Sequence, residues 1–272
     1  RLSLAADLRR AIEDGQLEVY FQPKVALTDQ QLIGVEALVR WEHPEHGTVT
    51  PDDFVPIAEH TGQYLPLTRL VLNRSLAQCR TWLDQNRELT VAVNVSVRCL
   101  SDPHFADEVS NTLRAHRVPA SMLTLEITES GVMSEIERVL PTLTKLREHG
   151  IGLSVDDFGT GYSSLAYLRR LPVTEVKIDK SFVLAMGTDP ADLAIVKAIL
   201  ELGRHLDLTV VAEGVESEIS MSLLAEMACD VAQGFLLARP LPVDRLERWI
   251  ERRTVMESET AGKVRRLRVV GA

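Results

Sequence analysis

Short apolar runs alternate with longer amphipathic stretches along most of the chain, and this alternation limits the possible folds more than any other feature of the sequence. Helical periodicity is clear between several of the runs, for example in residues 65–83, 136–147 and 193–206. Strands that alternate with helices at this spacing form parallel sheets with helical crossovers. The candidate strands are residues 18–25, 31–41, 90–96, 122–128, 151–159, 174–179, 208–215 and 229–235. Strands in this number predict a closed α/β barrel, a modified (β/α)8 fold of the TIM type.

The first two candidate strands are too close in sequence for a helix to connect them, so we expect the first strand to pair antiparallel with the second. The barrel is predicted to occupy residues 1–251, and the basic tail of residues 252–272 is predicted to lie outside it. Residues 42–54 are rich in turn formers and are expected to form an ordered surface excursion.

Composition narrows the possible partners and compartment. A net charge of −9 argues against a nucleic-acid polymer as the main partner. The three cysteines are far apart and form no CxxC pair, which is typical of a reducing, cytoplasmic setting. No segment approaches the ~20 apolar residues that a membrane span requires. The chain starts inside a helical pattern without an initiator Met, so we expect it to be one domain of a larger protein, which itself could be anchored in a membrane.

The two faces of each candidate strand differ in chemistry. Because side chains alternate along a strand, Leu125 and Ile127 lie opposite Glu126, and Asp156 lies opposite its neighbour Asp157. A barrel interior packed only for stability is filled mainly by branched aliphatic side chains. The charged faces therefore indicate a polar site at the carboxyl-terminal mouth of the barrel. The side chains expected to converge there are Glu36, Asn94, Glu126, Asp156, Lys177, Glu213 and Gln233.

Such a group of carboxylates indicates bound metal, because neighbouring carboxylates stay ionised only when cations neutralise them. An oxygen-only donor set suits Mg²⁺ or Mn²⁺. The adjacent pair Asp156 and Asp157 can contact two metals, as two-metal phosphoryl sites require. Lys177 is placed to hold a nucleophilic water or to add positive charge, and Arg40 to pair with a phosphate. The sequence thus predicts metal-dependent hydrolysis of a phosphodiester.

Across roughly residues 4–250 the chain resembles the EAL family of cyclic-di-GMP phosphodiesterases. A lone Glu-Ala-Leu tripeptide has no diagnostic value, but eight motifs occur here in the family's order and spacing. They are FQP (21–23), GVEALVRW (34–41), NVS (94–96), LEITES (125–130), DDFGTGYSSL (156–165), KIDKSF (177–182), AEGVE (212–216) and QGF (233–235). The one departure follows Gln233, where GFLLARP replaces a more aromatic stretch that usually ends in Lys-Pro.

The resemblance implies hydrolysis of cyclic di-GMP to linear 5'-pGpG with two Mg²⁺ or Mn²⁺ ions. By motif, the metal ligands would be Glu36, Asn94, Glu126, Asp156 and Asp157.

Other motif positions imply further roles. Glu36, Lys177 and Glu213 would be catalytic, with Lys177 positioning the water and Glu213 acting as a metal ligand or general base. The substrate-binding residues would be Gln22, Leu38, Arg40 and Gln233. Glu129 would brace the loop of residues 157–165, which in the family connects the metal site to a homodimer interface. An upstream sensory or cyclase-like domain is the expected regulator.

Two other functions compete with hydrolysis. A non-catalytic cyclic-di-GMP receptor would bind the nucleotide without cleaving it, but such domains typically lack a ligand or the lysine, and this sequence retains them all. A different metal-dependent barrel enzyme, such as a lyase acting on carboxylates, also uses acids and lysines at strand ends, but the eight motifs do not fit it.

Overall fold

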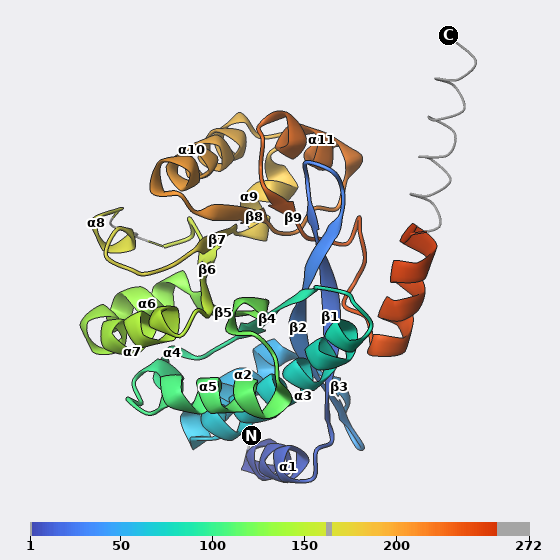
Figure 1. Ribbon diagram of the computed structural model, residues 1–272, viewed down its shortest axis with the longest axis vertical. Coiled ribbons are helices and arrows are strands. Elements are labelled where there is room, and N and C mark those ends of the chain that lie inside the picture. The colour runs from blue at the N-terminus through green and yellow to red at the C-terminus, as the bar shows by residue number, and fades with distance from the viewer. Residues whose placement is uncertain (1, 162–164, 255–272) are drawn as a thin grey trace.

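A computed structural model describes residues 2–161 and 165–254, and in it eight strands close into a barrel surrounded by helices (Figure 1). The hydrogen-bonded order is β1-β9-β8-β7-β6-β5-β4-β2, and β1 also pairs with β2, which closes the ring. This order confirms the predicted modified (β/α)8 barrel. The barrel strands are β1 (Leu17–Ala26), β2 (Leu32–His43), β4 (Thr90–Asn94), β5 (Leu123–Thr128), β6 (Gly152–Phe158), β7 (Glu175–Ile178), β8 (Thr209–Ala212) and β9 (Val231–Ala232).

The first strand runs against both of its neighbours, as the sequence predicted for its pairing with the second. β1 is antiparallel to β2 over a long register that places Gln22 opposite Glu36. It is also antiparallel to β9, through the pairs Val25↔Ala232 and Ala26↔Val231. The pairs from β2 through β4 to β9 are all parallel. The carboxyl ends of β2 and β4–β9 therefore meet at one mouth of the barrel.

Helices cover the outer wall, and the bulky faces of the strands pack beneath them. Val91, Val93, Leu123 and Leu125 are fully buried, which agrees with the predicted outward direction of this face. The helices are α1 (Leu2–Glu13), α2 (Pro51–Thr61), α3 (Tyr64–Asp84), α4 (Val97–Leu100), α5 (Phe105–His116), the 3₁₀ turn η1 (Ala120–Met122), α6 (Glu129–Ser134), α7 (Ile136–Glu148), α8 (Leu165–Leu168), α9 (Lys180–Ala185), α10 (Pro190–Leu206), α11 (Glu218–Glu226) and a last helix over residues 243–254.

The last helix lies beside the β1–β2 turn, where Arg253 donates a hydrogen bond to the carbonyl of Gln30. It continues to residue 254, beyond the predicted barrel boundary at residue 251. The remainder of the predicted tail, residues 255–272, lies outside the described residues. Within the described part of the chain, no helix combines the length and the apolar character needed to cross a membrane.

Residues 42–54 are more regular than the predicted surface excursion. β2 extends past its last pair with β4 and turns back through β3 (Gly47–Val49), whose register joins Trp41 to Val49. The excursion is anchored because Trp41 and Phe54 are both fully buried and contact each other edge to face, with ring centroids 5.7 Å apart. The prediction for this segment rested on its turn-forming residues and took no account of these two apolar anchors.

Small residues let the strands approach below the mouth. A Cβ atom on Gly34 would lie 2.1 Å from Oγ1 of Thr90, and one on Gly152 would lie 2.7 Å from Oγ1 of Thr124. Each glycine therefore leaves room for a threonine on the adjacent strand, since Gly34 pairs with Thr90 and Gly152 with Thr124.

Candidate active site

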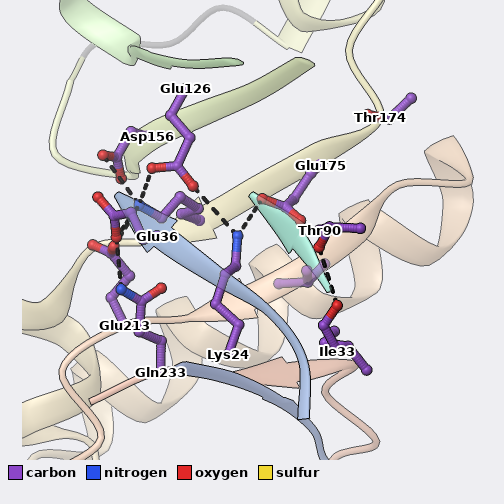
Figure 2. A network of polar contacts seen from close by, with 12 residues as sticks. Lys24, Ile33, Glu36, Thr90, Glu126, Asp156, Thr174, Glu175, Glu213 and Gln233 are labelled. Carbon is purple, nitrogen blue, oxygen red and sulfur yellow. Dashed lines mark hydrogen bonds and ion pairs between the residues drawn. The ribbon is translucent and has the colours of Figure 1, made fainter. Parts of the chain in front are cut away.

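The seven polar side chains expected at the mouth come from seven consecutive barrel strands or from the residue just after a strand. Glu213 follows β8 directly and Gln233 follows β9. Figure 2 shows the labelled Glu36, Glu126, Asp156 and Glu213 pointing toward one another. The predicted convergence is therefore present in the structure, contributed by β2 (Glu36), β4 (Asn94), β5 (Glu126), β6 (Asp156), β7 (Lys177), β8 (Glu213) and β9 (Gln233).

Lys177 is the centre of this group. Its Nζ lies 2.7 Å from Oε2 of Glu126 and 2.7 Å from Oε1 of Glu213. The same nitrogen lies 3.3 Å from Oε2 of Glu36 and 3.3 Å from Oδ2 of Asp156. Burial opposes the charged form of Lys177, but the four carboxylates outweigh burial and raise its pKa well above the usual value. One fully buried ammonium group thus stands among four acids.

Glu36 is held from both sides. Asn94 donates from Nδ2 to Oε1 of Glu36 at 2.7 Å, and Gln233 donates from Nε2 to Oε2 at 2.6 Å. Burial raises the pKa of Glu36, but the charge of Lys177 and the two hydrogen bonds lower it to about 2. Glu36 is therefore an ionised, oriented oxygen ligand at any physiological pH.

Gln22 belongs to the same cluster, through Gln233. Nε2 of Gln233 also donates to Oε1 of Gln22 at 3.0 Å, and Nε2 of Gln22 donates to the carbonyl of Ala238 at 3.1 Å. Gln22 is thus tied to the segment after β9 and lies beside Glu36. Oε1 of Gln233 is buried and has no hydrogen-bond partner among the described residues, so it remains available as an acceptor.

Asp157 reaches the mouth by a backbone irregularity. Strict alternation puts it on the face opposite Asp156, but its φ angle is +56°, and the register with β7 shifts between Val155 and Phe158. A left-handed conformation costs roughly 1–3 kcal/mol for a residue other than glycine, and such strain is typical of functional sites. The consequence is that carboxylate oxygens of Asp156, Asp157 and Glu213 lie within 4.8 Å of one another.

The chemistry of these three acids fits a divalent cation. Burial, followed by the charges of Asp156 and Asp179, raises the pKa of Asp157 to about 6. Burial also raises the pKa of Glu213 to about 7, where Asp156 and Glu36 add to the effect and Lys177 opposes it. Carboxylates are destabilised in this way when no cation neutralises them. An oxygen-only set within 4.8 Å is therefore a candidate Mg²⁺ or Mn²⁺ site.

The metal-free domain is expected to lose stability as the pH rises from about 4 to 7. The pKa of Glu213 is about 7 in the folded chain and 4.5 in the unfolded chain, and that of Asp157 is about 6 against 3.8. Between these values the folded state binds more protons, so the free energy of unfolding falls with rising pH. The shift of the Glu213 pKa from 4.5 to about 7 changes the free energy of unfolding by at most about 3 kcal/mol. The pKa of Glu36 is lowered instead, so the titration of Glu36 affects the free energy of unfolding only at pH values below this window.

Thermal melting in EDTA at several pH values measures this effect. We expect the melting temperature to fall toward neutral pH, and a Glu213→Gln variant to show a shallower decline. A melting temperature that is constant or rises over the same window would contradict the assignment of unneutralised acids at the mouth.

Glu129 braces the segment after β6. It is buried at the start of α6, and its Oε2 accepts a hydrogen bond from the backbone N–H of Gly159 at 2.8 Å. A Cβ atom on Gly161 would lie 2.6 Å from Oε1 of Glu129, so a larger residue there would displace the carboxylate of Glu129. Residues 162–164 of the predicted loop lie outside the described residues.

Leu38 and Arg40 extend from Glu36 along the part of β2 that passes the mouth. The last pair between β2 and β4 is Ala37↔Val93, so both residues lie beyond the barrel wall on the face of Glu36. The guanidinium of Arg40 lies 5.8 Å from the ring centroid of Tyr20 and donates to the carbonyl of Val39 at 2.8 Å. Both side chains are only partly buried, which is suitable for contact with a ligand.

Two charged residues of the interior were not predicted. Lys24 on β1 is buried, and its Nζ contacts Oε1 of Glu126 at 3.3 Å and Oε1 of Glu175 at 3.0 Å. The sequence could have placed both residues in the interior, because Lys24 is two residues from Gln22 and Glu175 is two residues from Lys177. Alternation places each of them on the same face as its predicted partner.

Comparison with known proteins agrees with this geometry. The family model described as the EAL domain matches residues 5–240. The bifunctional diguanylate cyclase/cyclic di-GMP phosphodiesterase MucR of Pseudomonas aeruginosa is 46% identical over 90% of this chain and 36% of its own length. The oxygen sensor protein DosP of Escherichia coli is 41% identical over 92% of this chain and 31% of its own length. The chain therefore spans about a third of the length of these relatives.

Solved structures show the same fold. A structure of the PaMucR phosphodiesterase in complex with c-di-GMP is 46% identical, covers 90% of this chain and 99% of its own, and superposes with a TM-score of 0.86. The EAL enzyme Bd1971 in its cAMP- and cyclic-di-GMP-bound form is 31% identical, covers 92% of this chain and 68% of its own, and gives a TM-score of 0.87. With its barrel, its acids and a family match over nearly its whole described length, the chain belongs to the EAL domain family.

Proposed function

We propose that the domain hydrolyses cyclic di-GMP to linear 5'-pGpG by a two-metal mechanism. The observation that carries the proposal is the group of four carboxylates, three on strands and one directly after a strand, around the buried ammonium of Lys177. The related PaMucR structure, which has the same fold, is a c-di-GMP complex. The complete acidic group supports catalysis over the alternative of a receptor that binds the nucleotide without cleaving it.

The proposed metal ligands are Glu36, Asn94, Glu126, Asp156 and Asp157. Divalent cations held there would polarise the scissile phosphate, stabilise its developing charge and make a water easier to deprotonate. Glu36 is presented as an ionised ligand by Asn94 and Gln233, so its geometry is set before any cation binds. Preorganised ligands of this kind reduce the reorganisation that the reaction requires.

Proton transfer is assigned to Glu213 and the positioning of water to Lys177. Water attacks the phosphorus, the bond from phosphorus to the 3'-oxygen breaks, and that oxygen leaves with a proton, so the product keeps a 5'-phosphate. A general base must lie within hydrogen-bond reach of the water that it deprotonates, and a carboxylate oxygen of Glu213 lies within 4.8 Å of those of Asp156 and Asp157. Nζ of Lys177 lies 2.7 Å from Glu213, which places a donor beside the base.

Substrate contacts are assigned to residues on β2, on β1 and just after β9, which are neighbours in the barrel. Arg40 is placed to pair with a phosphate, since its guanidinium is only partly buried. Gln22, on the neighbouring strand β1, and Gln233, just after β9, lie next to Glu36, and Leu38 offers an apolar surface. We also propose that the domain acts within a longer signalling protein, because it spans about a third of its curated relatives.

Incubation of the purified domain with cyclic di-GMP and Mg²⁺ tests the proposal. We expect linear pGpG to accumulate on anion-exchange chromatography, to stop accumulating when EDTA removes the metal, and to resume when Mg²⁺ or Mn²⁺ is restored. Binding of cyclic di-GMP without product would instead support the receptor function. Neither binding nor product, with the dimer state measured in parallel, would contradict both.

A further inference from the structure

Glu126 is the most enclosed acid of the site, and two different lysines hold it. Its side chain is fully buried. Oε2 contacts Nζ of Lys177 at 2.7 Å, whereas Oε1 contacts Nζ of Lys24 at 3.3 Å. Figure 2 shows Lys24 reaching Glu126 from the side of the carboxylate opposite Glu36. The two oxygens of Glu126 are therefore distinguished by their partners.

Lys24 contacts Glu126 across the interior of the barrel. It extends from β1, whereas Glu126 is on β5 and its other partner, Glu175, is the first residue of β7. Nζ of Lys24 lies 3.0 Å from Oε1 of Glu175, whose side chain is 15% exposed. Glu175, Lys24 and Glu126 thus form a row that extends from the amino-terminal end of β7 to the site at the mouth.

The two lysines, Lys24 and Lys177, differ in the number of carboxylates that each contacts. Lys177 is shared among four carboxylates, and Glu126 is one of these four. Lys24 has two carboxylate partners, and Glu126 is its sole contact at the mouth among the described residues. A buried lysine is retained only when it is paired, because isolated burial of a charge is costly. Lys24 is therefore placed to set the orientation of Glu126.

We propose that Lys24 is a positioning residue for the metal site: it holds Oε1 of Glu126, so that Oε2 is directed to Lys177 and the acids around it, and Glu175 holds Lys24 in place. This inference rests on the proposed function, since it takes Glu126 as a metal ligand. Partners behind a metal ligand orient it, and their loss typically weakens metal binding by about 10- to 100-fold.

The direction in which metal affinity changes when Lys24 is removed distinguishes a positioning role from a purely electrostatic one. A positive charge near a cation site repels the cation, so removal of Lys24 should tighten metal binding if charge alone matters. Removal should weaken binding if Lys24 orients Glu126. A lysine that only fills and stabilises the barrel would change the melting temperature and leave the affinity of the folded protein for metal unchanged.

The test compares the parent domain with Lys24→Met, Glu175→Gln and the double variant. Metal affinity is measured by calorimetric titration with Mn²⁺, melting temperature by circular dichroism, and kcat and KM with cyclic di-GMP. The double variant leaves no unpaired carboxylate at position 175, so it guards against misfolding of Lys24→Met. Glu175→Gln removes the charge that holds Lys24 but keeps both Lys24 and Glu126, so it measures the contribution of Glu175 alone.

We expect Lys24→Met and the double variant to bind Mn²⁺ about 10- to 100-fold more weakly than the parent. Glu175→Gln should lose less affinity, and kcat should fall more than KM changes. A folded double variant with the parent's affinity, or a higher one, overturns the positioning role. A double variant that does not fold assigns Lys24 to barrel stability and also overturns it. A parent that neither binds Mn²⁺ nor hydrolyses cyclic di-GMP overturns the proposed function itself, whereas an active parent with unaffected variants overturns the positioning role alone.

Discussion

Replacement of Glu36 by glutamine (Glu36→Gln) is expected to lower kcat by at least about 10²- to 10³-fold, the loss that follows removal of a single preorganised hydrogen-bond donor from an active site. Glu36 receives hydrogen bonds from Asn94 and Gln233 and contacts Lys177, so the loss of its charge weakens the proposed metal site at its best-ordered ligand. The shape of the side chain is nearly unchanged. The barrel should therefore stay folded while metal binding and hydrolysis decline together.

Parallel assays of pGpG formation, Mn²⁺ titration and thermal melting distinguish this outcome from misfolding. Glu42→Gln is a matched control, because Glu42 is an exposed glutamate on the same strand that accepts a hydrogen bond from Thr48. That variant should keep the parent's kcat and metal affinity. If Glu36→Gln retained the parent's turnover, Glu36 would not be a metal ligand.

Lys177→Met is expected to destabilise the metal-free domain and to abolish most of its activity. Nζ of Lys177 contacts four carboxylates while fully buried, so its removal leaves them without a counter-charge. Removal of one partner from a buried ion pair costs about 3–5 kcal/mol. Metal should restore part of this loss, since a cation would replace the missing charge. The melting temperature should therefore rise more on addition of Mn²⁺ than it does for the parent.

Melting curves with and without Mn²⁺, together with kcat, measure both effects. Lys197→Met provides the control, since Lys197 is an exposed lysine on α10. It should melt like the parent in EDTA and hydrolyse at the parent's rate. A metal-free Lys177→Met domain that melts at the parent's temperature would show that the carboxylates do not depend on Lys177.

The sequence predicts the barrel and most of the site because both follow from alternation. Side chains at every second position face the interior, so Glu126 and Lys177 could be placed at the mouth without coordinates. The antiparallel β1 followed from the short connection to β2. Glu36 was likewise assigned to the interior, where the structure buries it.

Alternation failed where the backbone departs from regular strand geometry. Asp157 returns to the mouth through a positive φ angle at a non-glycine residue, and no local pattern marks such a residue. Adjacency to Asp156 and the family motif gave its assignment as a metal ligand, whereas alternation placed it on the opposite face. Lys24 was missed for a different reason, since its role depends on partners that are 102 and 151 residues away along the chain. Alternation gives the face of a residue but not the partners it meets across the interior.

Closure of the barrel between β1 and β9 joins the two ends of the sequence, and this has a consequence for the order of folding. Gln22 and Gln233 are separated by 211 residues and become neighbours only when this seam forms, and the same is true of the bond from Gln233 to Glu36. Loop-closure entropy makes such contacts late events. A nascent chain on the ribosome that has not yet exposed β9 therefore has the acids of β2–β8 but no closed mouth. Catalytic competence should be the last property that the emerging chain acquires.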